Sequence, residues 1–410
     1  MLRVGWFSNW LSFDYLRDTG VPKNIREIPY LKTLIKAGHK IYWIGTARHP
    51  DAENYEGIVN YGGIYNGLPK WDPDRWDETA DYVRDMAVNY EKYARRPLPD
   101  VDAVFIRILP SFIYENAKIY ILLYQYGLRG IPVFARDLEL QMIVKFIENP
   151  PKYPLKKPFG ISGSDKAFTE KDWKIMSKNL HILAPLGPKG LKWIKDRAPH
   201  LSFESFMFPY DPNLYPTMTL GPIQRHVTYI GNDTGRRAGF LKYFKGLPQD
   251  YVHVFGGQAR QVDKVDKGFP SSIKDRLPNI SWHEAIPHSS VNSKYNTSAS
   301  CMNIPRPYIY DVEFISARFL EAVYSGAVLL LPEEFFNAVH WTGSEDLVIH
   351  CPLDIKKIVD VIAKDNKQRL RHIVRQRLWL RTFSNPETDI TKVLNISGEN
   401  HAHLRDWSRS

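Results

Sequence analysis

The chain has 410 residues, of which 43% are hydrophobic, and a formal net charge of +10 at pH 7. This length exceeds what a single hydrophobic core usually serves, so we expect two domains. No apolar run reaches the roughly 18 residues that a membrane-spanning helix needs, and the first residues do not resemble a secretory signal sequence. These features argue against a membrane-spanning protein, and we expect a soluble protein of the cytoplasm.

Cysteine usage and net charge narrow the class further. Cys301 and Cys351 are the two cysteines of the chain, too few for a disulfide framework and without the spacing of metal ligands. We therefore expect a reducing compartment and no structural zinc. The positive net charge favours polyanionic partners such as nucleic acids or nucleotides.

In the first half of the chain, short apolar segments alternate with longer segments of helical periodicity. We expect strands at 2–7, 40–45, 101–108, 131–136 and 180–185, and helices at 25–38, 77–94 and 116–130. This alternation is typical of a parallel sheet covered by helices on both faces. The long loop 148–165, rich in proline and lysine, interrupts the alternation and is either a functional loop or a surface excursion.

A second alternation begins near residue 222. Strands are expected at 226–231, 251–257, 280–286 and 327–332, and helices at 237–247, 313–326 and 354–383. The sequence thus predicts an α/β fold of two Rossmann-like doubly wound domains that face one another across a cleft. We place the acceptor-side domain at 1–215, the donor domain at 216–383, and a tail at 384–410 that packs back toward the first domain. Ligands of doubly wound sheets bind beyond the carboxyl ends of the strands.

The stretch EFISARFLEAVYSGAVLLLP, residues 313–332, carries two glutamates and an arginine on one expected helix. Arg318 and Glu321 are three residues apart and share a face, and Glu313 lies eight residues before Glu321, close to two turns. All three side chains can therefore point into one site. The alternative is an exposed pair of opposite charges on a solvated helix. Because the helix leads into a buried strand, its start lies at the rim where nucleotides bind.

This stretch resembles the glutamate, seven residues, glutamate pattern of glycosyltransferases with the GT-B fold. The match R-x-x-E-A-x-x-S-G-A is similar to the spore-maturation-type glycosyltransferase family, as is NTSASCMNIPRP upstream. The resemblance implies that Glu321 binds the ribose hydroxyls of a nucleotide-sugar donor, that Glu313 approaches the donor sugar, and that Arg318 lies near the phosphates. Ser325 departs from the family pattern, where cysteine is frequent, and Glu333 and Glu334 have no assigned role.

Four further positions fit a donor site. The segment YIGNDTGRRAGF is a strand, a turn at Gly231 and a helix start, an arrangement that accepts phosphate, with Arg236 and Arg237 as cations. It lacks the complete G-x-G-x-x-G of a dinucleotide fingerprint. His283 stands where GT-B proteins contact the nucleobase, although a lone histidine is more often structural.

A candidate catalytic carboxylate, Asp137, follows the expected strand 131–136. The position resembles that of an acid in phage DNA glucosyltransferases. In an inverting enzyme Asp137 would be the general base that deprotonates the acceptor hydroxyl, and in a retaining enzyme it would orient the acceptor or stabilise the sugar cation. The paired glutamates favour retention slightly. A helix cap is the alternative role for this residue.

Two basic elements suggest duplex DNA with a hydroxymethylated base, as in phage, as the acceptor. Residues 356–381 contain nine Lys or Arg and two acids. On a helix we expect Leu370, Ile373, Val374 and Leu378 to face inward and Arg371 and Arg375 outward. In the loop 148–165, we expect the acceptor to be bound by Lys152, Tyr153, Lys156 and Lys157, with Tyr153 and Phe159 able to stack or wedge. The alternative is that these basic residues form an ordinary solvated surface. The acceptor would then be a protein, a lipid or a glycan.

The sequence therefore predicts a glycosyltransferase that moves a sugar from a nucleotide diphosphate donor, most simply a UDP-sugar, to a hydroxyl acceptor. No Asp-x-Asp pair stands in a suitable place, so donor binding is not expected to require a divalent metal. The alternatives are a sugar-nucleotide epimerase and a non-catalytic nucleic-acid-binding protein of the same fold. A phage-encoded enzyme would act in the host cytoplasm.

Overall fold

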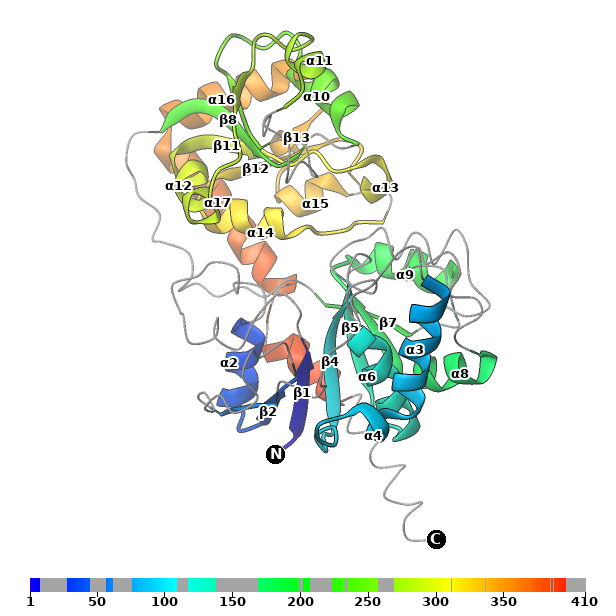
Figure 1. Cartoon of the computed structure of the whole chain (residues 1–410). Coiled ribbons are helices and arrows are strands. Elements are labelled where there is room, and N and C mark those ends of the chain that lie inside the picture. Colours follow the sequence, from blue (N-terminus) through cyan, green and yellow to red (C-terminus); the bar gives the residue numbers. More distant parts are fainter. Residues whose placement is uncertain are drawn as a thin grey trace. The chain divides into compact units, whose positions relative to one another are not determined.

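The computed structural model of the chain divides into two compact units, Met1–Pro209 with Pro386–Ser410 and Tyr210–Asn385 (Figure 1). The structure describes residues 1–7, 28–44, 57–61, 76–108, 117–137, 169–197, 199, 202–206, 223–232, 235–256, 269–310, 312–335, 337–383, 385 and 387–395. Each unit is built on one parallel sheet. The predicted α/β fold class is confirmed.

The sheet of the first unit has seven strands in the order β3-β2-β1-β4-β5-β6-β7, and every neighbouring pair is parallel. The sheet therefore grows in both directions from β1 and β4, as in doubly wound folds. The strands are β1 Arg3–Phe7, β2 Lys40–Trp43, β3 Ile58–Asn60, β4 Ala103–Ile108, β5 Val133–Asp137, β6 Leu180–Ala184 and β7 Ser202–Ser205.

Helices connect these strands. They are α2 Ile28–Lys36, α3 Trp76–Val88, α4 Tyr90–Tyr93, α6 Ala117–Leu128, α8 Glu170–Lys178 and α9 Pro188–Arg197. The first turn of α8 is fixed by a capping box, in which Thr169 Oγ1 accepts from the Asp172 backbone N–H and Asp172 accepts from that of Thr169. Asp172 also pairs with Arg84 at 2.8 Å, which ties α8 to α3.

The core of the first unit explains why it includes the end of the chain. Trp6 of β1 stacks on Phe105 of β4 with ring centroids 5.0 Å apart. The same buried cluster contains Ile390, Val393 and Leu394, which lie in a helical segment at 387–395. The burial of these apolar side chains holds the helical segment 387–395 on the first sheet.

The second unit has six parallel strands in the order β10-β9-β8-β11-β12-β13. They are β8 Gln224–Ile230, β9 Val252–Phe255, β10 Ser281–His283, β11 Ser298–Met302, β12 Val328–Pro332 and β13 Val348–Ile349. The helices are α10 Arg237–Phe244, α11 Ser271–Lys274, α12 His288–Thr297, α13 Pro307–Tyr310, α14 Ala317–Tyr324, α15 Ala338–Thr342, α16 Pro352–Lys364 and α17 Asn366–Phe383, with a 3-10 turn at Glu345–Leu347.

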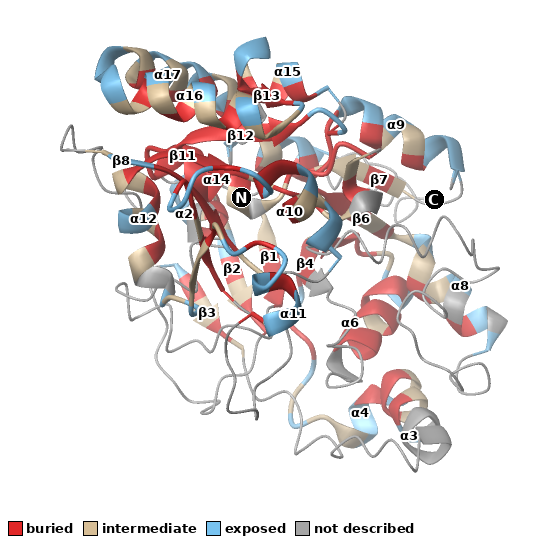
Figure 2. Ribbon diagram, turned by 90° about the horizontal axis from the view of Figure 1, so that it is seen from above, coloured by how far each residue is buried: buried red, intermediate tan, exposed pale blue. Residues whose placement is uncertain are grey.

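The two faces of this sheet differ in chemistry. Alternate residues of β8 point to opposite faces, and Val227 and Tyr229 join an apolar cluster with Phe240 of α10 and Val359 of α16. On the other face, the polar His226 and Thr228 lie toward α12, which contacts β8 and β11. Figure 2 shows β8, β11 and β12 as buried strands. The second face therefore carries buried polar side chains at β8, next to buried apolar side chains such as Leu329 and Leu331 of β12.

The predicted single helix at 354–383 is wrong. The chain forms two helices, α16 and α17, that are separated at Asp365. Asp365 ends α16 in an extended conformation, and its Oδ1 accepts from the backbone N–H groups of Lys367 and Gln368. An aspartate in this position caps the next helix, because it satisfies donors that have no partner within that helix.

No described helix combines the length and hydropathy of a membrane crossing.

Candidate functional site

The carboxyl edge of the second sheet gathers several polar residues. Because the strands are parallel, β8, β11 and β12 all end at this edge, and the loops after them contain Gly231, Asn303 and Glu333. The helix α14 also begins here, since it runs back along the sheet before β12. Asn303 Nδ2 donates to Oγ of Ser316, the N-cap of α14, at 3.2 Å. This bond fixes the start of α14 beside the end of β11.

Arg318 and Glu321 lie on α14 and are close to each other. Arg318 hydrogen bonds with the buried Tyr295 of α12 and interacts electrostatically with Glu321 and Tyr229. Burial alone would lower the pKa of the Arg318 guanidinium, but the interactions with Tyr295, Glu321 and Tyr229 raise it overall. Glu321 is 7% exposed. The structure thus brings these two candidate donor-binding residues together on one partly buried surface.

Glu313 does not belong to this helix, which corrects the sequence prediction. The helix begins at Ala317 because Ser316 is extended, with φ −75° and ψ 154°. Glu313 lies in a turn with φ 51°, a left-handed conformation that is uncommon for residues other than glycine. Its carboxylate is 1% exposed and accepts from Trp341 Nε1 at 2.8 Å. The argument from helical spacing therefore holds for Arg318 and Glu321 and fails for Glu313.

Gly231 and Arg236 occupy the loop after β8. Arg236 Nε donates to the Ile304 carbonyl at 2.9 Å, and Nη1 donates to Asn232 Oδ1 at 2.7 Å. Arg236 therefore joins the loops that follow β8 and β11. Arg237, the first residue of α10, is exposed at the same helix start.

Glycine is required where β8 and β9 end. Gly256 has φ 146°, and a Cβ at this position would lie 1.9 Å from the Gly231 carbonyl oxygen. No residue with a side chain fits without moving the backbone, so the two strand ends approach as closely as main chains allow. This close approach leaves backbone groups, and not side chains, at that point of the edge.

His283 ends β10 and belongs to a row of stacked rings. Its Nε2 lies 3.0 Å from His253 Nδ1, and its ring stacks on Phe255 with centroids 4.4 Å apart. His253 in turn stacks on His226 at 4.1 Å. Burial lowers the pKa of all three histidines, and the pKa of His226 falls to about 3. The row is therefore neutral at pH 7.

The Glu333–Glu334 pair, for which the sequence suggested no role, is part of an ion network. Lys242 of α10 donates to both carboxylates, at 2.7 Å for Glu333, and Tyr243 donates to Glu334. His350 Nδ1 lies 2.7 Å from Glu333, and this contact raises the pKa of His350. The network joins α10 to the residues that follow β12.

The candidate residues of the first unit lie at or beyond the edge of what the structure describes. Asp137 is the last residue of β5, where it pairs in register with Ile108 at the carboxyl edge, and its side chain lies outside the described part. Lys152, Tyr153, Lys156, Lys157 and Phe159 lie outside the described residues.

The predicted faces of α17 are right in part. Ile373 is buried and Arg371 and Arg375 are exposed, as expected, whereas Val374 and Leu378 are 48% and 59% exposed. Two polar residues share the inward face with Ile373. Arg369 donates to the Gly326 and Asn296 carbonyls at 2.6 and 2.9 Å. Gln376 bonds both the N–H and the C=O of Leu329, each at 3.0 Å.

Residues from other elements complete the site, and sequence reasoning missed them. Tyr295 comes from α12, Asn303 from the end of β11, and Trp341 from α15. One signal was visible in the sequence. Ser316 precedes an amphipathic segment and therefore marks a helix start, which places Glu313 outside the helix. Within the described part of the chain, no group of three or more His, Cys, Asp or Glu is arranged to hold a metal ion.

No family model and no curated protein sequence matches the chain. Solved structures do. T4 phage beta-glucosyltransferase has a TM-score of 0.52 at 14% identity, over 99% of both chains. Sucrose-phosphate synthase from Thermosynechococcus elongatus has a TM-score of 0.56 at 11% identity, over 98% of this chain and 100% of the other. An O-GlcNAc transferase mutant from Thermobaculum terrenum has a TM-score of 0.51 at 10% identity, over 97% and 67%.

These structures are GT-B glycosyltransferases, and the likeness at such low identity establishes the fold. The chain has the GT-B fold, with two Rossmann-like units. A chain of this fold binds ligands beyond the carboxyl ends of its strands, the edge at which Arg318 and Glu321 lie.

Proposed function

We propose that the protein is a glycosyltransferase that moves a sugar from a nucleotide diphosphate donor to a hydroxyl acceptor. The observation that carries the proposal is that Arg318 and Glu321 interact electrostatically on α14, whose start lies at the carboxyl edge of the sheet. A second support is the R-x-x-E-A-x-x-S-G-A pattern of the same segment, which resembles the spore-maturation-type glycosyltransferase family.

The two side chains suit the two ends of a nucleoside diphosphate. The Glu321 carboxylate can accept two hydrogen bonds from the ribose hydroxyls. The Arg318 guanidinium presents a planar set of donors that matches phosphate oxygens, and Arg237 lies at a helix start where anions are favoured. Cations at the departing diphosphate stabilise the charge that develops as the glycosidic bond breaks, which is frequently the largest catalytic contribution.

UDP-glucose is the first donor to test. Solved structures of T4 phage beta-glucosyltransferase include complexes with UDP-glucose and with UDP and Mn²⁺. For this chain we propose that donor binding does not require a divalent ion, because Arg318, Arg236 and Arg237 supply the positive charge. Titration of UDP-glucose with Mn²⁺ and with EDTA tests this directly.

For the acceptor we propose a hydroxymethylated base in duplex DNA, the substrate class suggested by the basic segments. One structural relative is a DNA modifying enzyme, beta-glucosyltransferase. Cations at Lys152, Lys156 and Lys157 would contact the phosphates, and Tyr153 would support the displaced base. With retention, Asp137 would orient the hydroxymethyl group or stabilise the sugar cation, rather than act as the general base.

The DNA proposal is tested by a salt series. Phosphate contacts release counterions, so affinity for hydroxymethylated duplex DNA should fall steeply as salt rises. Exchange of Lys152, Lys156 and Lys157 for glutamate should raise the acceptor KM and leave donor affinity unchanged. If no DNA binds at low salt, the acceptor is a protein, lipid or glycan, and the donor assignment stands.

We propose that the enzyme retains the anomeric configuration of the sugar. For this, Glu313 must release its hydrogen bond from Trp341 and contact the donor sugar instead. The anomeric proton coupling in the product separates the outcomes. Inversion would instead assign Asp137 as the general base.

Product analysis with and without acceptor tests the proposed activity. A glycosyltransferase releases UDP and transfers sugar when the acceptor is present. Conversion of the nucleotide sugar without any acceptor would identify an epimerase. DNA binding with no change in any nucleotide sugar would identify a non-catalytic DNA-binding protein.

A further inference from the structure

The helix α17 has an unusual distribution of side chains for a surface helix. Its buried positions hold Arg369 and Gln376, which bond to backbone groups of the core, together with the apolar Ile373 and Leu380. Its outward stripe, at the spacing i, i+3, i+4 and i+7, is Arg371, Val374, Arg375 and Leu378. A helix whose outer face meets only water normally carries polar side chains there, so the exposed Val374 and Leu378 depart from the usual pattern.

The outward stripe borders a groove of about 1260 Å³ between α17 and α15. Val339 of α15 adds a third exposed apolar side chain, at 48%. These three are among eight large apolar side chains that are exposed in the described part of the chain. Their concentration in one groove distinguishes it from the scattered apolar residues of an ordinary surface.

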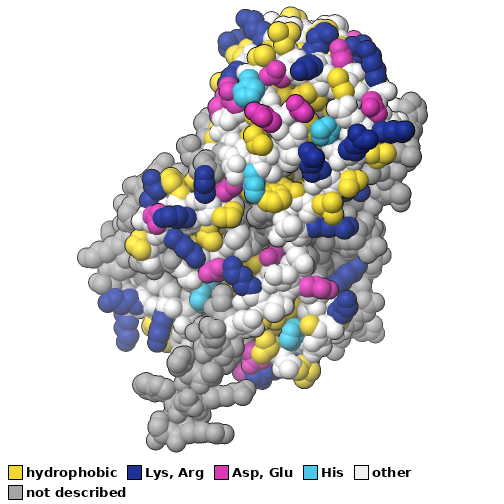
Figure 3. Space-filling view, turned by 180° about the vertical axis from the view of Figure 1, so that it is seen from behind, with side chains coloured by type: hydrophobic (Ala, Val, Ile, Leu, Met, Phe, Trp, Pro, Cys, Tyr) yellow, Lys and Arg dark blue, Asp and Glu magenta, His cyan; other side chains and the backbone are white. Residues whose placement is uncertain are grey.

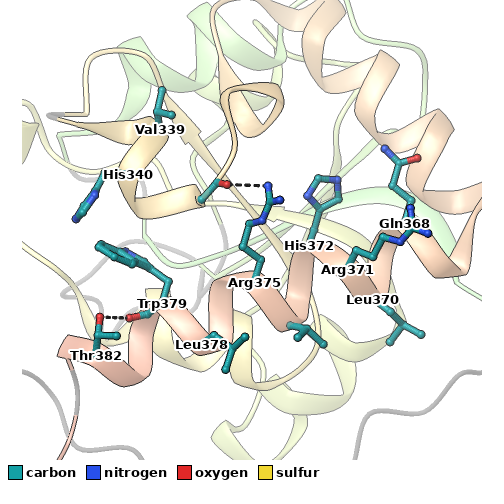
Figure 4. A pocket seen from close by; sticks show the side chains of 12 residues that line it. Val339, His340, Gln368, Leu370, Arg371, His372, Arg375, Leu378, Trp379 and Thr382 are labelled. Carbon is teal, nitrogen blue, oxygen red and sulfur yellow. Dashed lines mark hydrogen bonds between the residues drawn. The ribbon is translucent and has the colours of Figure 1, made fainter.

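Cations line the same groove. Figure 4 shows Arg371, His372 and Arg375 projecting from α17, with His340 beside Trp379. Arg375 Nη1 donates to the Gly343 carbonyl at 3.0 Å, which holds its guanidinium over the end of α15. Among the described residues that line the groove there is no Asp or Glu. On the face seen from behind in Figure 3, the part that belongs to the second unit carries hydrophobic side chains among Lys, Arg, Asp and Glu.

We propose that this groove docks an acidic amphipathic helix of a partner protein. The apolar face of such a helix would cover Val339, Val374 and Leu378. Carboxylates four residues apart would pair with Arg371 and Arg375, which are themselves four residues apart on α17. The proposal is independent of the proposed function, because it uses no residue of the donor site.

Two other occupants fit the groove less well. A nucleic acid backbone would satisfy the arginines but would bury three apolar side chains against phosphates, which is unfavourable. A second copy of this chain, related by a two-fold axis through the groove, would place Arg371 and Arg375 against the same arginines without a carboxylate between them.

The experiment is a selection from a displayed library of helical peptides against the full chain. The variant Arg371→Glu/Leu378→Asp serves for counter-selection, and the best peptides are then measured by fluorescence anisotropy. Because both side chains are exposed, the double variant should unfold at the wild-type temperature. Lys274→Glu/Leu353→Asp, which changes an exposed cation and an exposed apolar residue outside the groove, is the matched control.

We expect selected peptides to carry two Asp or Glu four residues apart beside an apolar stripe. Their affinity should fall at least about tenfold in the groove variant, as expected for loss of an apolar anchor and a charge pair, and should not change in the control. Three results would overturn the proposal: no peptide is enriched, enriched peptides are basic or bind both variants equally, or duplex DNA displaces them and binds wild type but not the groove variant.

Discussion

Two helices of the second unit, α14 and α17, both contact β12 and both carry arginine, but they use it differently. In α14, Arg318 hydrogen bonds with Tyr295 and interacts electrostatically with Glu321 near the carboxyl edge of the sheet. In α17, Arg369 and Arg377 donate to backbone carbonyls at 2.5 to 3.2 Å and fasten the helix to the core. The number of basic residues in a helix therefore does not by itself indicate a binding surface, because arginines such as Arg369 and Arg377 stabilise the fold.

The largest effect is expected in α14. Glu321→Ala and Arg318→Ala should each lower kcat/KM for the donor by about 10²-fold or more, because each removes a contact to the ribose or the diphosphate. Arg318→Lys, which keeps the charge but loses the planar set of donors, should recover only part of the activity. Steady-state kinetics checks this, with unfolding temperature as the control for folding. Full activity in both alanine variants would remove α14 from the donor site.

Asp137→Asn extends the comparison to the first unit. If Asp137 is a general base, the substitution keeps the shape, removes the charge, and lowers kcat by about 10²-fold while donor affinity stays the same. Single-turnover transfer with saturating donor measures the step. A variant as active as wild type would leave Asp137 with a capping role at the end of β5.

In α17 the effect should fall on stability. Arg369→Ala should lower the free energy of unfolding by about 2 to 4 kcal/mol, because two buried carbonyls lose their donor. Arg371→Ala, two residues away and exposed, should change it by about 0.5 kcal/mol or less. Urea unfolding monitored by tryptophan fluorescence compares the two. Equal losses in both variants would contradict the assignment of separate roles.

The smallest effect concerns the histidine row of the same sheet. His226 is buried, with Nε2 3.1 Å from the hydroxyls of both Thr228 and Ser298, and its pKa is about 3. The unfolded chain binds a proton near pH 6.5 and the folded chain does not, so stability should fall as the pH drops from 6.5 toward 3. At pH 5 this one group accounts for a loss of about 2 kcal/mol.

His226→Gln supplies the control for that pH dependence. Glutamine keeps hydrogen-bonding capacity toward Thr228 and Ser298 but does not titrate in this range. The difference in unfolding temperature between pH 7 and pH 5 should therefore be smaller in the variant. An unchanged difference would assign the pH dependence to other groups.

Local patterns in the sequence predicted nine of the thirteen described strands, because buried parallel strands such as VLLLP at β12 are continuously apolar. They missed β3, β7 and β13, which are short or edge strands, and β11, whose sequence SASCM is small and partly polar. They predicted the neighbourhood of Arg318 and Glu321, since both fall within one real helix. They failed at Glu313, because a left-handed turn and the Ser316 cap interrupt the apparent periodicity.

The pattern also failed in part for α17, for a tertiary reason. Periodicity assigns apolar residues to the core, but here Gln376 occupies an inward position, where it bonds both backbone groups of Leu329. The need of that strand for hydrogen-bond partners is not visible in the local sequence. Likewise, Tyr295 and Trp341 lie far along the chain from the residues they hold, so no spacing rule identifies them.

We propose above all that the carboxyl edge of the second sheet, where α14 begins, binds a nucleotide sugar. Isothermal titration of UDP-glucose into wild type and Glu321→Ala tests it most directly. We predict saturable one-to-one binding to wild type and an affinity at least about tenfold weaker in the variant, in proportion to the loss of the ribose contact. Equal affinity in the two proteins, or the absence of binding for every nucleotide sugar tried with wild type, would contradict the account.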